Sequence, residues 1–287
     1  MSKVISLSKQ PTLLVPTDYM TLLLFGDTRS GKTRWAGTMP RPLFFSEHSE
    51  GGWKTLESMD RSLWYEPDVE PLVWTIEHVG DLPQLITNAK ALITSGRVKT
   101  IVFDSITFYA DLYLAFLTQG IPVEKQDPRQ IYGKLGTHLR ERRVEVHRLG
   151  VNVAWLALAA EPDDDHPNIR PMIPGKEGAK FGAGCSFIMY FRKQIAARGG
   201  APPREHFDIF TRNEGKALAG CRDGGILPSP LPTNTYRGFI ECFNNTRREA
   251  GIQTASNTSV VTAPSGMVSS SPARPQGAAP RVFKART

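Results

Sequence analysis

The sequence is poor in cysteine and has no long apolar run, and these two absences narrow the classes of protein it can be. Its three cysteines, Cys185, Cys221 and Cys242, are odd in number and far apart, which argues against a disulfide framework or a paired CxxC metal site. No stretch approaches the roughly 18 consecutive apolar residues that a membrane span needs. The opening residues, MSKVISLSKQPT, lack the apolar centre of a secretory signal. We therefore expect a soluble cytoplasmic protein with no membrane partner.

Acidic residues are missing from Gln253 onward. This segment is rich in Ser, Pro, Ala, Thr and Gly, and its charges are all positive: Arg274, Arg281, Lys284 and Arg286. Low apolar content without periodicity is typical of disorder. We predict a disordered basic tail over 251–287 that contacts nucleic acid or binds a partner such as a single-strand binding protein. The alternative is a solubilising tail with no specific role.

The rest of the chain is long enough to bury one substantial core. Of its 287 residues, 40% are hydrophobic, so one main domain is expected. Its 35 Lys and Arg against 28 acidic residues give a net charge of +7, which favours a polyanionic partner. We predict an N-terminal extension over 1–14 and one α/β domain over 15–250, followed by the tail.

Apolar runs of strand length alternate with longer amphipathic stretches, a pattern typical of a mainly parallel sheet flanked by helices. The helical stretches, each closed by a glycine, are 82–96 and 129–150. The expected strands are 21–25, 42–46, 100–103, 151–159, 185–195 and 205–212.

The stretch FGDTRSGKT matches the phosphate-binding pattern G-x-x-x-x-G-K-[ST] between a strand and a helix. In such a loop, backbone N–H groups surround phosphate oxygens, and the following helix presents its positive end. Lys32 would bind the β- and γ-phosphates of ATP, and the Thr33 hydroxyl would hold Mg²⁺. The alternative is an ordinary glycine turn. The predicted nucleotide-binding residues are Gly26, Asp27, Thr28, Arg29, Ser30, Gly31, Lys32 and Thr33.

Two acidic residues are candidates for the chemistry beside that loop. Asp104 ends the apolar run TIVF, so it would lie at the carboxyl edge of the sheet as a second Mg²⁺ ligand. Its alternative role is to cap the next helix. Glu47 follows the strand PLFFS and is predicted to be the catalytic base, provided that this strand neighbours the strand of the phosphate loop. Glu50 is its competitor.

With these elements the chain resembles the RecA-like core of P-loop ATPases, and within it the short phage ATPases that act as single-strand annealing recombinases. The resemblance covers 15–245 and depends on GDTRSGKT, FFSEH, IVFDS and VNVAWLALAAEP. It implies ATP and Mg²⁺ as cofactors, single-stranded DNA as a partner, self-association into a ring or filament, and phage origin, hence a host cytoplasm. The family's polar γ-phosphate sensor is absent here, and Glu161 is the nearest polar residue.

After that last strand the resemblance places a DNA-binding loop, here the Gly- and Pro-rich segment 162–185. Its cations and one aromatic could bind phosphates and stack on a base. The run of three aspartates at 163–165 opposes this unless it faces elsewhere or holds a cation. A surface lid is the alternative. The predicted DNA-binding residues are Arg170, Lys176, Lys180 and Phe181.

RecA-like enzymes also complete their active site with a cation from a neighbouring subunit. The corresponding stretch here is KALAGCRDGG, in which Arg222 would stabilise charge on the transferred phosphoryl group. Gly220 stands where the family has a lysine, and Lys216 is the second choice.

The resulting hypothesis is a slow ATPase, stimulated by DNA or by assembly, that binds single strands and promotes annealing or recombination. One alternative is a helicase-type motor, loader or protein remodeller. Another is a nucleotide-binding regulator or phosphotransferase, which is disfavoured because no acceptor pocket or cluster of lid arginines can be identified.

Overall fold

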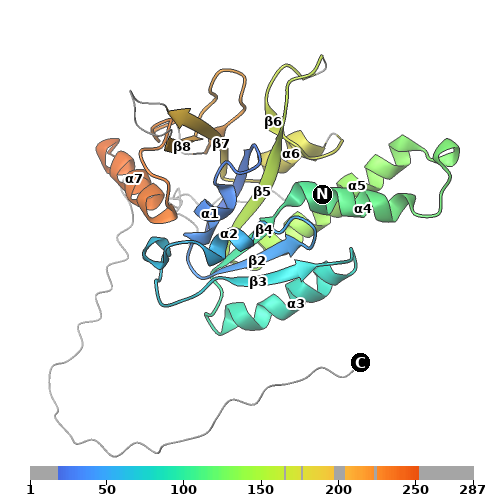
Figure 1. Cartoon of the computed structure of the whole chain (residues 1–287), viewed down its shortest axis with the longest axis horizontal. Helices are drawn as coiled ribbons and strands as arrows, with labels where there is room; N and C mark the ends of the chain where they lie inside the picture. Colours follow the sequence, from blue (N-terminus) through green and yellow to red (C-terminus); the bar gives the residue numbers. More distant parts are fainter. Residues whose placement is uncertain (1–18, 165, 176, 197–203, 223–224, 252–287) are drawn as a thin grey trace, which may run out of the picture. The chain divides into compact units, whose positions relative to one another are not determined.

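The computed structural model describes residues 19–164, 166–175, 177–196, 204–222 and 225–251, and these form a sheet of nine strands (Figure 1). The main path runs β3-β2-β4-β5-β1-β7-β8, while β6 pairs with β5 and β9 with β7. The strand bounds are β1 Thr21–Gly26, β2 Pro42–Glu47, β3 Leu72–Ile76, β4 Thr100–Asp104, β5 Asn152–Ala160, β6 Arg170–Pro171, β7 Phe187–Ala196, β8 Arg204–Phe210 and β9 Gly220–Cys221.

The sheet is mainly parallel. β1 pairs in parallel with β5 and β7, and β2 pairs in parallel with β3 and β4. β4 lies parallel to β5, whereas β6, β8 and β9 are antiparallel to their partners. This arrangement confirms the predicted α/β fold. The predicted N-terminal extension and the predicted tail beyond residue 251 lie outside the described residues.

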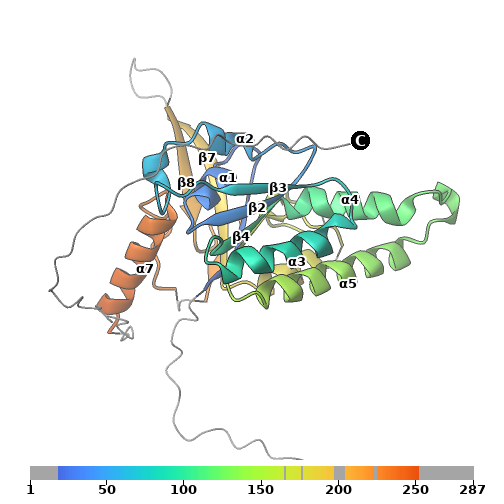
Figure 2. The same ribbon diagram turned by 90° about the horizontal axis from the view of Figure 1, so that it is seen from below.

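Helices cover both faces of the sheet (Figures 1 and 2). Apolar side chains of α3, α4, α5 and α6 pack on one face, and those of α1, α2 and α7 pack on the other. The helix bounds are α1 Lys32–Gly37, α2 Lys54–Glu57, α3 Asp81–Thr94, α4 Ile106–Thr118, α5 Pro128–His147, α6 Glu177–Ala183 and α7 Tyr236–Glu249, with short 3₁₀ turns η1 Arg61–Leu63 and η2 Val123–Lys125.

The central strands are apolar on both sides because each side meets a helix layer. In β1, Leu23 and Phe25 join the core under α3 to α6, whereas Leu22 and Leu24 join the core under α1, α2 and α7. Side chains alternate along a strand, so a strand buried on both faces is a continuous apolar run. That is why these strands could be predicted from the sequence.

The two predicted helices are confirmed as α3 and α5. Asp127 caps α5 by accepting from the Arg129 N–H at 2.9 Å, and Pro128 occupies the first turn. β3 and α7 were not predicted, whereas α4 is the helix expected to follow Asp104. No helix among the described residues combines the length and apolarity that crossing a membrane requires.

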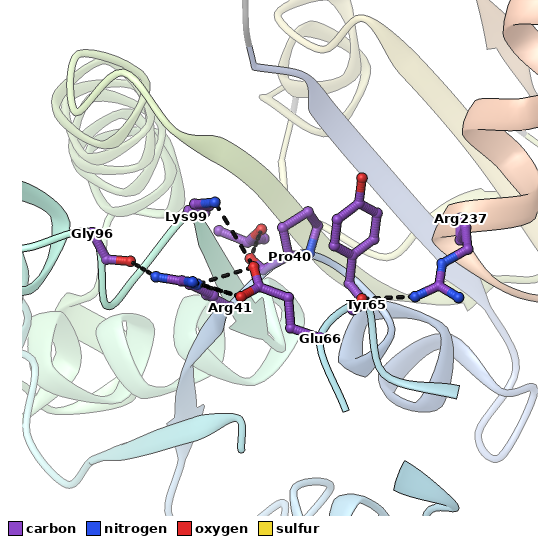
Figure 3. Close-up of polar contacts among 8 residues, drawn as sticks. Pro40, Arg41, Tyr65, Glu66, Gly96, Lys99 and Arg237 are labelled. Atoms are coloured by element: carbon purple, nitrogen blue, oxygen red, sulfur yellow. Dashed lines mark hydrogen bonds and ion pairs between the residues drawn. The ribbon is translucent and has the colours of Figure 1, made fainter. Parts of the chain in front are cut away.

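Beside the amino ends of β2 and β4 lies a group of interacting residues, here called the amino-end cluster. It consists of the charged residues Arg41, Glu66 and Lys99 and the backbone carbonyl of Gly96. The Arg41 guanidinium donates to Glu66 through Nε at 2.8 Å and Nη2 at 2.6 Å, and to the Gly96 carbonyl at 2.6 Å. Lys99 Nζ lies 3.8 Å from Glu66 Oε1 (Figure 3). The cluster ties the segment before β3 to the sheet. Arg237 of α7 holds the same segment by donating to the Tyr65 carbonyl at 2.7 Å.

Candidate nucleotide-binding site

The glycine-framed loop lies where β1 ends and α1 begins. A side chain at Gly26 is impossible, because a Cβ there would lie 2.1 Å from the Phe191 carbonyl oxygen of β7. Arg29 adopts a left-handed backbone with φ 61°, and the Ser30 N–H donates to the Asp27 carbonyl at 3.2 Å. The strand, the tight loop and the helix are thus the context that a phosphate-binding loop requires.

Lys32 reaches back along this loop and is almost completely buried. Its Nζ donates to the carbonyl oxygens of Gly26 and Asp27, both at 2.8 Å. Burial lowers the pKa of the Lys32 ammonium to about 8, although Asp104, Glu50 and Asp27 act in the opposite direction. The loop therefore holds a desolvated cation, which phosphate oxygens would neutralise.

Thr33 and Asp104 meet at the carboxyl edge of the sheet. The Thr33 hydroxyl donates to Asp104 Oδ2 at 2.9 Å, and Asp104 is only 2% exposed. Burial raises the pKa of Asp104 to about 6, opposed by the Thr33 hydrogen bond and by Lys32. A hydroxyl and a carboxylate in contact are oxygen ligands that suit Mg²⁺. Both residues were predicted for this role.

The expectation that the strand carrying Glu47 neighbours β1 is wrong. β2 pairs with β3 and β4, so β4 and β5 separate it from the phosphate loop. Glu47 accepts instead from the backbone N–H of Ser49 at 2.9 Å and from its hydroxyl. The predicted catalytic base therefore lies outside the cleft that the phosphate loop lines.

Glu50, the competitor of Glu47, does line that cleft. It faces Asp104, Lys32 and Ser105, and its Oε2 atom is buried without a hydrogen-bond partner among the described residues. Burial, followed by the charge of Asp104, raises the pKa of Glu50 to about 7, while hydrogen bonds from Ser105 and the charge of Lys32 lower it. A carboxylate with one unused oxygen in this place can accept a proton or a hydrogen bond from a water molecule.

Two glycines bring Glu50 into position. The turn at 50–52 folds back so closely that a Cβ on Gly52 would lie 2.8 Å from Asp104 Oδ2. Gly51 has φ 61°, a conformation that glycine adopts without cost. The pair of glycines after Glu50 is the signal in the sequence that could have favoured it over Glu47.

These groups line one cleft, here called the nucleotide cleft, with a volume of about 610 Å³. All of the predicted loop residues from Thr28 to Thr33 line it, together with Glu50 and Asp104. Phe207 of β8 also lines it and would lie 3.4 Å from a Cβ on Gly31. Sequence reasoning missed Phe207, because its position depends on the pairing of β7 with β8. Its half-buried ring offers a planar surface for a nucleoside.

Arg222 lies far from this cleft along the sheet. It follows β9, which pairs with the amino end of β7, and its guanidinium donates to the Ala183 carbonyl. β7 and β1 are parallel, with Phe187 beside Leu22 and Phe191 beside Gly26. Arg222 is therefore at the edge opposite the phosphate loop of its own chain. Its predicted role on a neighbouring subunit stays a prediction.

The predicted DNA-binding residues have separate positions. Arg170 starts β6 and donates to Asp163 at 2.9 Å, so this member of the aspartate run does hold a cation. Lys180 is exposed on α6, and Lys176 lies outside the described residues. The prediction that Phe181 stacks on a base is wrong, because Phe181 is 1% exposed and packs edge-on against Trp155 at 5.0 Å.

Comparison with known families agrees with this geometry. A family model described as an AAA domain matches residues 18–196. The matched span contains the phosphate loop, Glu50, Asp104 and the segment after β5. A search of curated proteins found no match.

Proposed function

This chain belongs to the AAA domain family, and from that premise we propose that it is an ATP-hydrolysing, RecA-like protein that binds single-stranded DNA and promotes annealing or recombination. One observation carries the ATPase part of the proposal: the buried Lys32 and Asp104 and the half-buried Glu50 converge in one cleft behind a glycine-framed loop. Charges are kept buried together chiefly where chemistry uses them.

Each residue has a defined task in hydrolysis. Lys32 would exchange its two carbonyl acceptors for β- and γ-phosphate oxygens, and Thr33 and Asp104 would hold Mg²⁺. The ion would neutralise charge on the phosphates. Glu50 would take the proton from the water whose oxygen bonds to the γ-phosphorus, while the bond to the ADP oxygen breaks.

The DNA-binding part of the proposal is supported by the segment that follows β5. β6 folds back beside the end of β5, and Met172 donates through its N–H to the Leu158 carbonyl at 2.7 Å. The Thr107 hydroxyl donates to the Met172 carbonyl at 2.8 Å and accepts from the Leu158 N–H at 3.0 Å. Because Thr107 lies three residues after Asp104, these bonds join the metal-binding strand to the segment that carries Arg170.

A net charge of +7 supports a polyanionic partner. Self-association would bring Arg222 of one subunit to the cleft of the next, so that ATP acts as an assembly switch. Phage origin remains part of the proposal through the resemblance to phage recombinases.

The proposal is tested by single-strand binding and oligonucleotide annealing, each with and without ATP and Mg²⁺. The native chain should bind single strands with an affinity that falls steeply with salt and should anneal complementary oligonucleotides. Lys32→Ala should lose the effect of ATP. Thr107→Val, which keeps the shape and removes the hydroxyl, should hydrolyse ATP without coupling it to DNA. Absence of both binding and annealing at low salt would remove the recombinase proposal and leave the ATPase.

A motor, loader or protein remodeller is the second candidate, favoured by one surface. Phe116 of α4, Ile121 in the following connection and Val123 of η2 are 57%, 41% and 81% exposed. Clustered exposed apolar residues are typical of protein contacts. A remodeller would hydrolyse ATP in response to a protein partner and would show no salt-dependent single-strand binding.

A further inference from the structure

A second pocket, here called the loop pocket, is lined by the segment after β5. Its volume is about 450 Å³, and it shares no lining residue with the nucleotide cleft. Leu23 of β1, Ile188 of β7 and Ile173 line its interior, and Leu218 forms part of its rim. Leu23 and Ile173 are buried, whereas Leu218 is 40% exposed. The pocket is thus apolar inside and open at one side.

Backbone hydrogen bonds hold the two sides of this pocket together. The Ile169 N–H donates to the Lys216 carbonyl at 2.8 Å, and the Leu218 N–H donates to the Ile169 carbonyl at 3.0 Å. The segment carrying Leu218 is therefore fixed to the segment carrying Arg170. A pocket fixed in this way is preformed, which lowers the entropy cost of binding.

The polar groups of the pocket include Arg170 and His166, and Asp163 orients both. Asp163 accepts from Arg170 Nη2 at 2.9 Å and from the His166 backbone N–H at 2.7 Å, and its Oδ1 lies 3.0 Å from His166 Nδ1. Arg170 Nη1 is buried, and no described residue accepts a hydrogen bond from it. The pocket thus combines an apolar interior with an oriented guanidinium that has a donor left over.

We propose that the loop pocket takes one nucleotide unit of a bound single strand, with the base in the apolar interior and its phosphate on Arg170. This inference rests on the proposed function. The faces of a base suit apolar walls, and Asn168 in the lining can bond to a base edge. A surplus cationic donor suits a phosphate and not an apolar peptide side chain.

The test compares two labelled strands in saturating ATP and Mg²⁺, which keep the nucleotide cleft filled. One is an oligothymidine of about 15 nucleotides, and the other is an abasic strand of equal length that keeps every phosphate. Leu218→Trp fills the rim of the pocket and should weaken oligothymidine binding at least roughly fivefold while leaving the abasic strand unchanged. Arg170→Ala should weaken both strands.

Val123→Trp is the matched control, because it adds the same ring at an exposed position on η2, and it should change neither affinity. Thermal unfolding checks that each variant is folded. If the native chain binds oligothymidine and Leu218→Trp binds it equally well, the pocket assignment is lost and the proposed function stands. If the native chain binds neither strand at low salt, the pocket assignment and the single-strand-binding part of the proposed function are both lost, and the ATPase part stands. The strand assignment would be overturned if free thymidine monophosphate bound the native chain as tightly as the strand does and Leu218→Trp abolished that binding.

Discussion

Charged side chains at the two ends of the parallel sheet have their pKa values shifted in opposite senses. At the carboxyl end, Lys32 and Asp104 are buried and Glu50 is half-buried, and loss of solvent shifts the pKa of each in the direction that favours its neutral form. At the amino end, Arg41 and Glu66 pair with each other. The hydrogen bonds between them raise the pKa of Arg41 and lower that of Glu66, which favours the charged form of each. The carboxyl end is therefore destabilised by its charges, and the amino end is stabilised.

This difference indicates which charged residues can contribute free energy to the binding of a ligand. Charges that already have partners gain little from a ligand, whereas buried charges with shifted pKa values are relieved by one. ATP would supply an anionic partner to Lys32, and Mg²⁺ would supply a cationic partner to Asp104 and Glu50, in addition to the hydrogen bonds that these groups make within the chain. The amino-end cluster needs no ligand. Substitutions at the two ends should accordingly affect activity and stability in opposite proportions.

The largest effect is expected from Lys32→Met. Loss of the cation proposed to contact the transferred phosphate should lower ATP turnover by roughly 10²–10³-fold. Burial lowers the pKa of Lys32 to about 8 in spite of the nearby carboxylates, so the folded chain holds this ammonium at a cost in stability. Replacing it with an apolar side chain of similar length should leave the melting temperature the same or raise it. Steady-state phosphate release and thermal unfolding measure the two effects. Lys99→Met, in the amino-end cluster, is the control and should show normal turnover with a slightly lower melting temperature. Equal losses of stability in both variants would erase the contrast.

Glu50→Gln is expected to have the next largest effect. The amide keeps the shape but cannot take a proton, so turnover should fall roughly 10²-fold while ATP binding persists. Glu47→Gln, three residues earlier, should leave turnover unchanged. Binding of a fluorescent ATP analogue and phosphate release distinguish the two. If Glu47→Gln is inactive and Glu50→Gln is active, the catalytic base is Glu47 after all.

The sequence predicted the parts of this picture that depend on local pattern. The phosphate loop and Asp104 follow apolar runs directly, and a strand buried on both faces can be recognised without knowing its neighbours. The apolar runs did not distinguish Glu50 from Glu47, and the glycine pair after Glu50 is a local signal whose meaning the structure makes clear. Their difference depends on the pairing of β2 with β4 and on the fold-back at Gly52.

Two aromatic residues illustrate the same limit. Phe181 lies in a Gly- and Lys-rich stretch that resembles a surface loop, yet α6 turns it into the core against Trp155. Phe207 lies in a strand expected over 205–212, but only the antiparallel pairing of β8 with β7 brings it to the nucleotide cleft. Contacts between distant segments decide both positions, and no local period encodes them.

Glu50 at the carboxyl end and Glu66 at the amino end should make opposite contributions to the pH dependence of the protein's stability. Glu50 has a folded pKa of about 7 against 4.5 for an unperturbed carboxyl, so the folded protein binds the extra proton between these values. Its contribution to stability is complete below about pH 4.5 and is lost as the pH rises to about 7. Without metal and nucleotide, Glu50→Gln should therefore match the native chain at pH 4.5 and melt at a higher temperature at pH 8. A higher melting temperature for the native chain at pH 8 would contradict a destabilising Glu50.

Glu66→Gln should give the smallest effect and the opposite sign. The hydrogen bond from Arg41 lowers the pKa of Glu66, so its stabilising contribution is present above the unfolded pKa and is lost as the pH falls through the folded value. At pH 7 the variant should melt roughly 2–4 °C lower with normal ATP turnover, because a partly exposed ion pair contributes modestly. The difference between the variant and the native chain should vanish under acidic conditions, where Glu66 is protonated and is as uncharged as glutamine. Glu70→Gln is the matched control, since Glu70 pairs with Arg61 where both side chains are largely exposed. If Glu66→Gln lowers ATP turnover while Glu70→Gln does not, the amino-end cluster supports the catalytic end, and the two ends of the sheet are not independent.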